Sequence, residues 1–164
     1  MTCVSAAITT IAGNVNCSIV ARILLACYCG VQGCASIAVD MNRTHACHPQ
    51  WTGHARFHVV WQTATTVLLA FLEVFVLLAN GPWSRERFYL CAVLAALPMV
   101  GFFAAMATRK IYGGALSDRN GIPPLIVKTK RKSYALDMSI VAETAGLIFL
   151  FVLTLFFQHA SGPK

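Results

Sequence analysis

The chain has 164 residues, of which 57% are hydrophobic and 12% are charged. Soluble domains are about 45–50% hydrophobic and about 25% charged, and a globule of this size cannot bury so much apolar surface. The 13 basic and 6 acidic residues give a net charge of +7. The apolar excess excludes a disordered tail, a nucleic-acid-binding arm and almost any soluble fold, and the basic residues are gathered in loops between apolar stretches. The composition predicts an integral membrane protein of the all-α class.

Four apolar stretches are long enough to cross a bilayer, at residues 19–39, 59–79, 88–108 and 138–158. About twenty helical residues span about 30 Å, the thickness of the hydrocarbon core. Backbone groups in lipid must form their hydrogen bonds internally, so each span is expected to be a helix. The predicted fold is a single transmembrane domain over residues 1–164, a four-helix bundle. Residues 1–16 contain no Lys or Arg, so no signal peptide is expected and the first span is expected to stay.

The loops expected at about 40–58 and 109–137 lie at one end of such a bundle and carry most of the basic residues. The positive-inside rule therefore predicts that both loops are cytoplasmic and that both termini are on the non-cytoplasmic side. The glycosylation sequon Asn42-Arg43-Thr44 would then never meet the glycosylation machinery.

Ionisable residues inside spans are costly and usually face a partner in the bundle interior. Arg22 and Glu73 are expected at similar depths on adjacent antiparallel helices. We therefore predict a structural ion pair between them, because either charge alone would cost several kcal/mol. A proton or ion relay is the functional alternative.

Histidines cluster before the second span, and Thr52 is typical of a helix N-cap there. His54 and His58 then share one helical face, Gln62 extends it by a turn, and Glu143 on the fourth span is expected at a comparable depth. These four residues are the predicted catalytic site. The residues predicted to contact the substrate at the same interface are Asp40, Asn42, His45, His48 and Trp61.

Three interpretations of the histidine cluster remain open. The histidines could only hydrogen-bond a hydrated loop. A His–Glu pair could instead move protons on a hydrophobic small molecule that enters from the bilayer, in an isomerase, cyclase or hydratase reaction that requires no cofactor. His54 and His58 could also chelate a single zinc or iron ion. The histidines are too few for a di-iron desaturase.

Two motifs carry a resemblance: His48-Pro-x-Trp51 followed by His54-Ala-Arg-Phe-His58, and Tyr112-Gly-Gly-x-Leu-Ser-Asp-x-Asn-Gly-x-Pro-Pro. Together they resemble a family of small four-helix integral membrane proteins whose function is not established. The resemblance implies the architecture and supplies no activity. The site is also loosely similar to that of membrane sterol isomerases, although helix count and spacing differ.

The remaining expectations concern the alternatives to an enzyme and the partners of the protein. The alternative to an enzyme is a non-enzymatic accessory subunit or a metal- or lipid-binding module, and a transporter would need a dimer to enclose a path. The expected partners are membrane lipid and a hydrophobic small molecule, not nucleic acid, and a homo-oligomer is left open.

Overall fold

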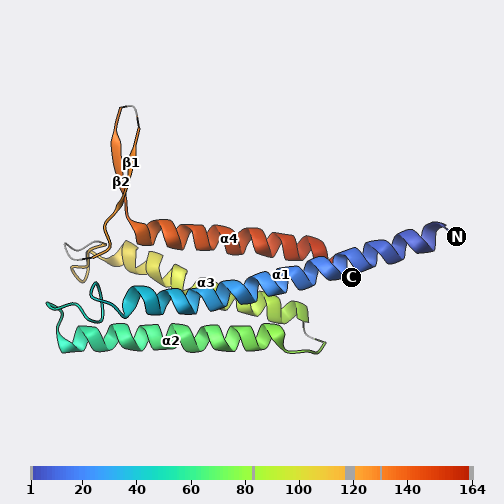
Figure 1. Cartoon of the computed structure of the whole chain (residues 1–164), viewed down its shortest axis with the longest axis horizontal. Coiled ribbons are helices and arrows are strands. Elements are labelled where there is room, and N and C mark those ends of the chain that lie inside the picture. The colour runs from blue at the N-terminus through green and yellow to red at the C-terminus, as the bar shows by residue number, and fades with distance from the viewer. Residues whose placement is uncertain (1, 83, 117–120, 130, 163–164) are drawn as a thin grey trace.

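The computed structural model describes residues 2–82, 84–116, 121–129 and 131–162. Its helices are α1 (Thr2–Asp40), α2 (Gly53–Leu78), α3 (Ser84–Thr108) and α4 (Met138–Ser161), with the strands β1 (Leu125–Lys128) and β2 (Ser133–Leu136) between α3 and α4. Figure 1 shows the helices side by side, with both termini at one end of the bundle. We call this the termini end. The opposite end, which carries the α1–α2 loop and the β1–β2 hairpin, is the loop end.

All four helices contain segments long and apolar enough to cross a membrane: 17–40, 53–78, 84–108 and 138–161. The predicted all-α four-helix bundle and integral membrane protein are thereby confirmed. Among these segments the largest difference from the predicted spans is at α2, which begins at Gly53 rather than 59. The Thr52 hydroxyl accepts the Ala55 amide hydrogen at 3.3 Å, so the helix is capped there and its first turns extend beyond the apolar span. The helix α1 itself begins further back, at Thr2.

The β1–β2 hairpin is a feature that the sequence analysis did not predict. Its antiparallel strands pair Leu125 with Leu136 and Lys128 with Ser133. The Thr129 amide and hydroxyl both donate to the Lys132 carbonyl at 2.8 Å, which closes the turn. Two four-residue strands are too short to give a clear alternation in a loop dominated by Gly, Pro and basic residues.

The buried core lies in the half of the bundle nearer the termini end. Phe88 of α3 and Phe157 of α4 stack there, with ring centroids 3.7 Å apart and planes 13° apart. The buried side chains of α3 all precede Val100, and those of α4 all follow Phe149. The remaining core is built mainly from small and aliphatic side chains of all four helices, namely Ala21, Leu25, Cys29, Leu77, Cys91, Ala95, Met99, Leu150 and Leu153.

Arg22 and Glu73 do not form the predicted ion pair in the described part of the chain. Arg22 instead donates from Nη2 to the Leu77 carbonyl, one turn of α2 nearer the termini end than Glu73. Glu73 is 1% exposed and shares a side-chain hydrogen bond with Cys29. Its Oε1 and the Nε of Arg22 have no hydrogen-bond partner. The Arg22 guanidinium therefore bonds to α2 one turn away from the Glu73 carboxyl group, because its partner is a main-chain carbonyl.

Candidate functional site at the loop end

A cavity of about 340 Å³ lies at the loop end, where three segments meet. The first segment is the α1–α2 loop, the second is the chain after α3, and the third is the start of α4. The first two belong to the loops expected at about 40–58 and 109–137, and both line this cavity. The lining residues are Thr44, His45, Trp51, Ala115, Leu116, Gly121, Ile122, Asp137, Met138 and Ser139.

His45 is held by a chain of hydrogen bonds that begins at the end of α1. The Asn42 side chain donates from Nδ2 to the Ala38 carbonyl at 2.8 Å, which fixes the orientation of its amide. Asn42 Oδ1 then accepts both the amide hydrogen of Thr44 at 2.8 Å and its hydroxyl hydrogen at 2.6 Å. Asn42, predicted to contact the substrate, is therefore occupied in shaping the loop.

This arrangement determines which nitrogen of a neutral His45 carries the proton. The Thr44 Oγ1 atom lies 2.8 Å from His45 Nδ1. A hydroxyl has one hydrogen, and Thr44 gives its hydrogen to Asn42, so Thr44 can only accept from the imidazole. Nδ1 therefore carries the hydrogen and Nε2 keeps a lone pair. A histidine in this state can act as a proton acceptor at the cavity.

Trp51 lies between two histidines of the same loop. The His45 ring contacts it edge-on, with centroids 5.7 Å apart, and the His48 ring stacks on it at 5.6 Å. His48 Nδ1 accepts the Gln50 amide hydrogen at 3.2 Å, so a neutral His48 carries its proton on Nε2. Its carbonyl accepts from Arg56 at 2.8 Å. His48 is buried and supports the loop, while His45 lines the cavity.

Asp137 is a cavity residue that the sequence analysis missed. It is the N-cap of α4, and its Oδ1 accepts the amide hydrogens of Ser139 at 2.9 Å and Ile140 at 3.1 Å. The signal was available, because an Asp directly before a long apolar run is typical of an N-cap.

His54 and His58 form the expected pair on one face of α2. Their Nε2 atoms are 3.1 Å apart and their rings meet edge-on, with centroids 4.5 Å apart. Both are exposed, as are Gln62 and Trp61, and the Trp61 ring lies 5.8 Å from that of His58. Among the described residues, no group of three His, Cys, Asp or Glu could hold a metal ion.

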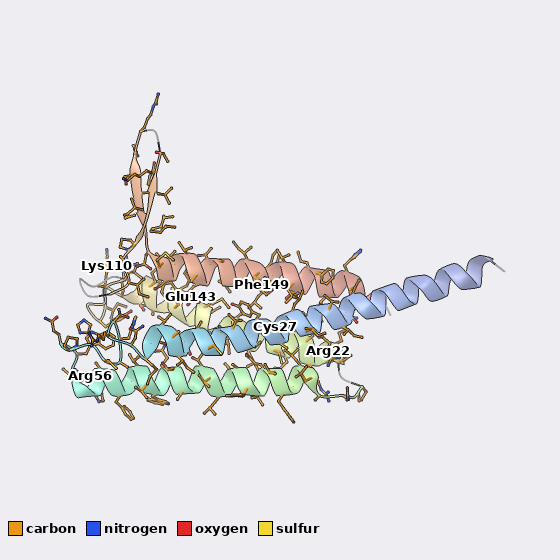
Figure 2. All side chains as sticks on the ribbon, viewed as in Figure 1. Arg22, Cys27, Arg56, Lys110, Glu143 and Phe149 are labelled. Carbon is orange, nitrogen blue, oxygen red and sulfur yellow. The ribbon has the colours of Figure 1, made fainter. Side chains whose placement is uncertain are left out.

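The structure does not bring the predicted catalytic residues together. His54 precedes the buried Thr63 by nine residues, two and a half helical turns, so it lies on the opposite side of α2 from the bundle interior. Glu143 lies on α4, and α1 and α3 stand between α2 and α4. Figure 2 shows α2, with Arg56 labelled near its start, and α4, with Glu143 labelled, on opposite sides of α1.

Asp40 and Glu143 are placed on the interior side instead. Asp40 Oδ2 accepts the Thr63 hydroxyl hydrogen at 3.3 Å, which ties the end of α1 to α2. Asp40 also interacts electrostatically with His45 and with Glu143. The predicted site is therefore divided between an exposed histidine pair on α2 and an acidic pair, Asp40 and Glu143, of which Asp40 interacts with His45.

Comparison of the chain with protein-family models, with curated proteins and with solved structures gave no match. The resemblance to the family of small four-helix proteins stays a prediction. Ser117 to Asn120 of its second motif lie outside the described residues.

Proposed function

We propose that this membrane protein binds a small amphiphilic molecule in the loop-end cavity and moves a proton on it, with His45 as the general base. The observation that carries the proposal is the hydrogen-bond chain from Asn42 through Thr44, which puts the proton of a neutral His45 on Nδ1 and leaves Nε2 with a lone pair; His45 itself lines the cavity. The reaction class stays the one expected from the sequence, an isomerase, cyclase or hydratase type. The residue proposed as the base is now His45 instead of a member of the His54–His58 pair.

The size and lining of the cavity suit such a molecule. Ligand pockets usually measure about 300–1,000 Å³ and combine apolar walls with a few polar groups. Leu116, Ile122 and Met138 supply apolar surface here, and Thr44 and Asp137 supply polar groups. A hydrophobic substrate dissolved in the bilayer would reach the cavity from the half of the bundle where α3 and α4 bury no side chain.

The charges around His45 favour a proton-transfer role. When Nε2 takes a proton from a carbon next to an electron-withdrawing group, the imidazole becomes positive. The nearby Asp40 carboxylate would stabilise that charge. Returning the proton to a different carbon completes an isomerisation in which atoms and electrons balance without an oxidant or a reductant.

Proton transfer can be tested without knowing the substrate, because a general base exchanges carbon-bound hydrogen with solvent. The purified protein in nanodiscs would be incubated with a total membrane lipid extract in D2O, and labile deuterium would then be washed out. We expect deuterium to remain on carbon in one lipid-soluble component. His45→Gln is expected to slow this incorporation by about a hundredfold or more.

The controls separate an enzyme from a binding module. His54→Gln removes a histidine outside the cavity and should incorporate deuterium like the unchanged protein. Native mass spectrometry of the same samples reports which lipid-soluble component stays bound. Equal deuterium incorporation by the His45→Gln variant would refute the role of His45 as general base. A bound component that never gains deuterium would also refute it, and would favour a non-enzymatic lipid-binding module.

We also propose that the loop end faces the cytoplasm. The loops there carry Arg43 and Arg109 with further basic residues, whereas the basic residues of the opposite side are Arg85 and Arg87, at the start of α3, and Lys164 at the end of the sequence. Cys47 is exposed in the α1–α2 loop. A membrane-impermeant thiol reagent should label it in inside-out vesicles and leave it unlabelled in intact cells. The opposite result, or sugar on Asn42, would invert the orientation.

A further inference from the structure

The β1–β2 hairpin takes no part in the cavity or in the packing of the bundle. All eight residues of its two strands are exposed. A two-stranded hairpin is marginally stable by itself in water, so stable strands need a further surface to pack on. We therefore expect the exposed hairpin to pack on a surface outside the bundle.

The strand register divides the hairpin into two unlike faces. Directly paired residues share a face, and neighbours along a strand alternate between faces. Leu125 and Val127 thus share one face with Leu136 and Tyr134, and this face is entirely large and apolar. The other face mixes apolar and polar side chains, namely Ile126, Lys128, Ser133 and Ala135. Such a hairpin is amphipathic.

The position of the hairpin places it at the membrane boundary. Figure 1 shows it projecting across the direction of the helices rather than along it, beside the start of α4, so its long axis runs along the membrane plane. A single residue, Asp137, separates the end of β2 from the start of the α4 span. The base of the hairpin is therefore fixed at the depth where the apolar span begins.

The charge of the hairpin matches one particular surface. Residues 125–136 contain four basic residues, Lys128, Lys130, Arg131 and Lys132, and no acidic residue. Each Lys or Arg near an anionic membrane surface contributes about 1 kcal/mol of attraction. Tyr134 is of the type that collects at the boundary between lipid and water.

We propose that the β1–β2 hairpin is a membrane-surface anchor that lies on the head-group layer of the protein's own bilayer and binds anionic phospholipid. Its apolar face covers the upper acyl chains, and the basic turn pairs with the phosphate groups. The hairpin then reaches laterally about 13 Å beyond its base, at about 3.3 Å for each of four strand residues. This role is independent of the chemistry proposed for His45.

Hydrogen exchange of the hairpin amides tests the anchor in the full-length protein. The protein would be placed as single copies in nanodiscs of either phosphatidylcholine alone or phosphatidylcholine with phosphatidylserine. We expect the amides of residues 125–136 to exchange about tenfold more slowly in discs that contain phosphatidylserine, and salt should reduce this difference. Single copies exclude protection by a second chain.

Matched variants separate the two faces and the basic turn. The triple change Lys128→Gln, Arg131→Gln and Lys132→Gln should abolish the difference between the two lipids, while Lys110→Gln, at the same end but outside the hairpin, should preserve it. Val127→Ser should raise exchange in both discs more than Ile126→Ser does. Equal exchange in both lipids, or protection that arises only in discs holding two copies, would overturn the anchor and favour self-association in the second case.

Discussion

The two halves of the bundle are built on different principles. Near the termini end, Phe88 and Phe157 stack in a core of small and aliphatic side chains. Near the loop end, α3 and α4 bury no side chain, and polar groups such as Asp40 and His45 interact with one another instead. The difference shows that packing holds the helices together in one half and leaves the other half free to form a cavity.

The membrane makes this division possible. Lipid chains are as apolar as leucine, so helices in a bilayer associate through close packing and hydrogen bonds rather than through exclusion of water. One tightly packed half can therefore fix the bundle. The other half can then carry a polar cavity, as active sites commonly require a rigid support beneath them.

The largest effect should come from the aromatic stack. Phe88→Ala removes a fully buried ring from the packed half and should lower the free energy of unfolding by about 3 kcal/mol or more. Phe102→Ala, on the same helix but in the loop half, should cost under about 1 kcal/mol, because lipid replaces most lost contacts. Unfolding by SDS in mixed micelles measures both. Equal losses would contradict the division into two halves.

A smaller loss is expected at Gly33, where α1 lies close to α2. A Cβ atom at Gly33 would lie 2.9 Å from Ala70 Cβ, whereas one at Gly30 would meet nothing within 4 Å. Gly33→Leu should therefore cost about 1–3 kcal/mol by forcing the helices apart. Gly30→Leu is the matched control and should be close to neutral in the same SDS titration. A Gly33→Leu variant as stable as the control would show that this contact is not needed.

The loop half can be probed at Thr44 with little change in shape. Thr44→Val keeps the volume but removes the oxygen that accepts from His45 Nδ1. Deuterium incorporation should fall about tenfold, as expected when a general base loses its orientation. Thr44→Ser keeps the oxygen and should restore most of the rate. Similar rates for the Val and Ser variants would mean that Thr44 does not position His45.

The smallest effect is expected at the exposed histidine pair. His54→Gln breaks the 3.1 Å contact with His58 on the surface of α2. The free energy of unfolding should change by less than about 0.5 kcal/mol, as is usual for surface substitutions. Native mass spectrometry should also show the same bound lipid-soluble component, in the same amount, for the variant and the unchanged protein. A marked loss of stability or of the bound component would contradict this expectation and would favour a functional role for the His54–His58 pair.

The sequence was sufficient for the spans, because long apolar runs such as the one in α4 have one stable state in lipid. It also identified the Thr52 cap and the spacing that brings His54 to His58. It could not lead to His45, the general base proposed above, since that proposal depends on which side of α2 faces the interior and on the hydrogen bonds of the α1–α2 loop. The hairpin was not predicted, because its register is set by the pairing of two short strands and not by a hydrophobic periodicity along the sequence.

The central claim is that the loop holds His45 with its proton on Nδ1 and its Nε2 free, and the side-chain nitrogens report this directly. Nitrogen-15 NMR of histidine-labelled protein in nanodiscs, at an alkaline pH where imidazole is neutral, distinguishes the two forms. The resonances of His45 are assigned by their loss in the His45→Gln variant. We expect a protonated Nδ1 and an unprotonated Nε2 for His45. A proton on Nε2 would contradict it.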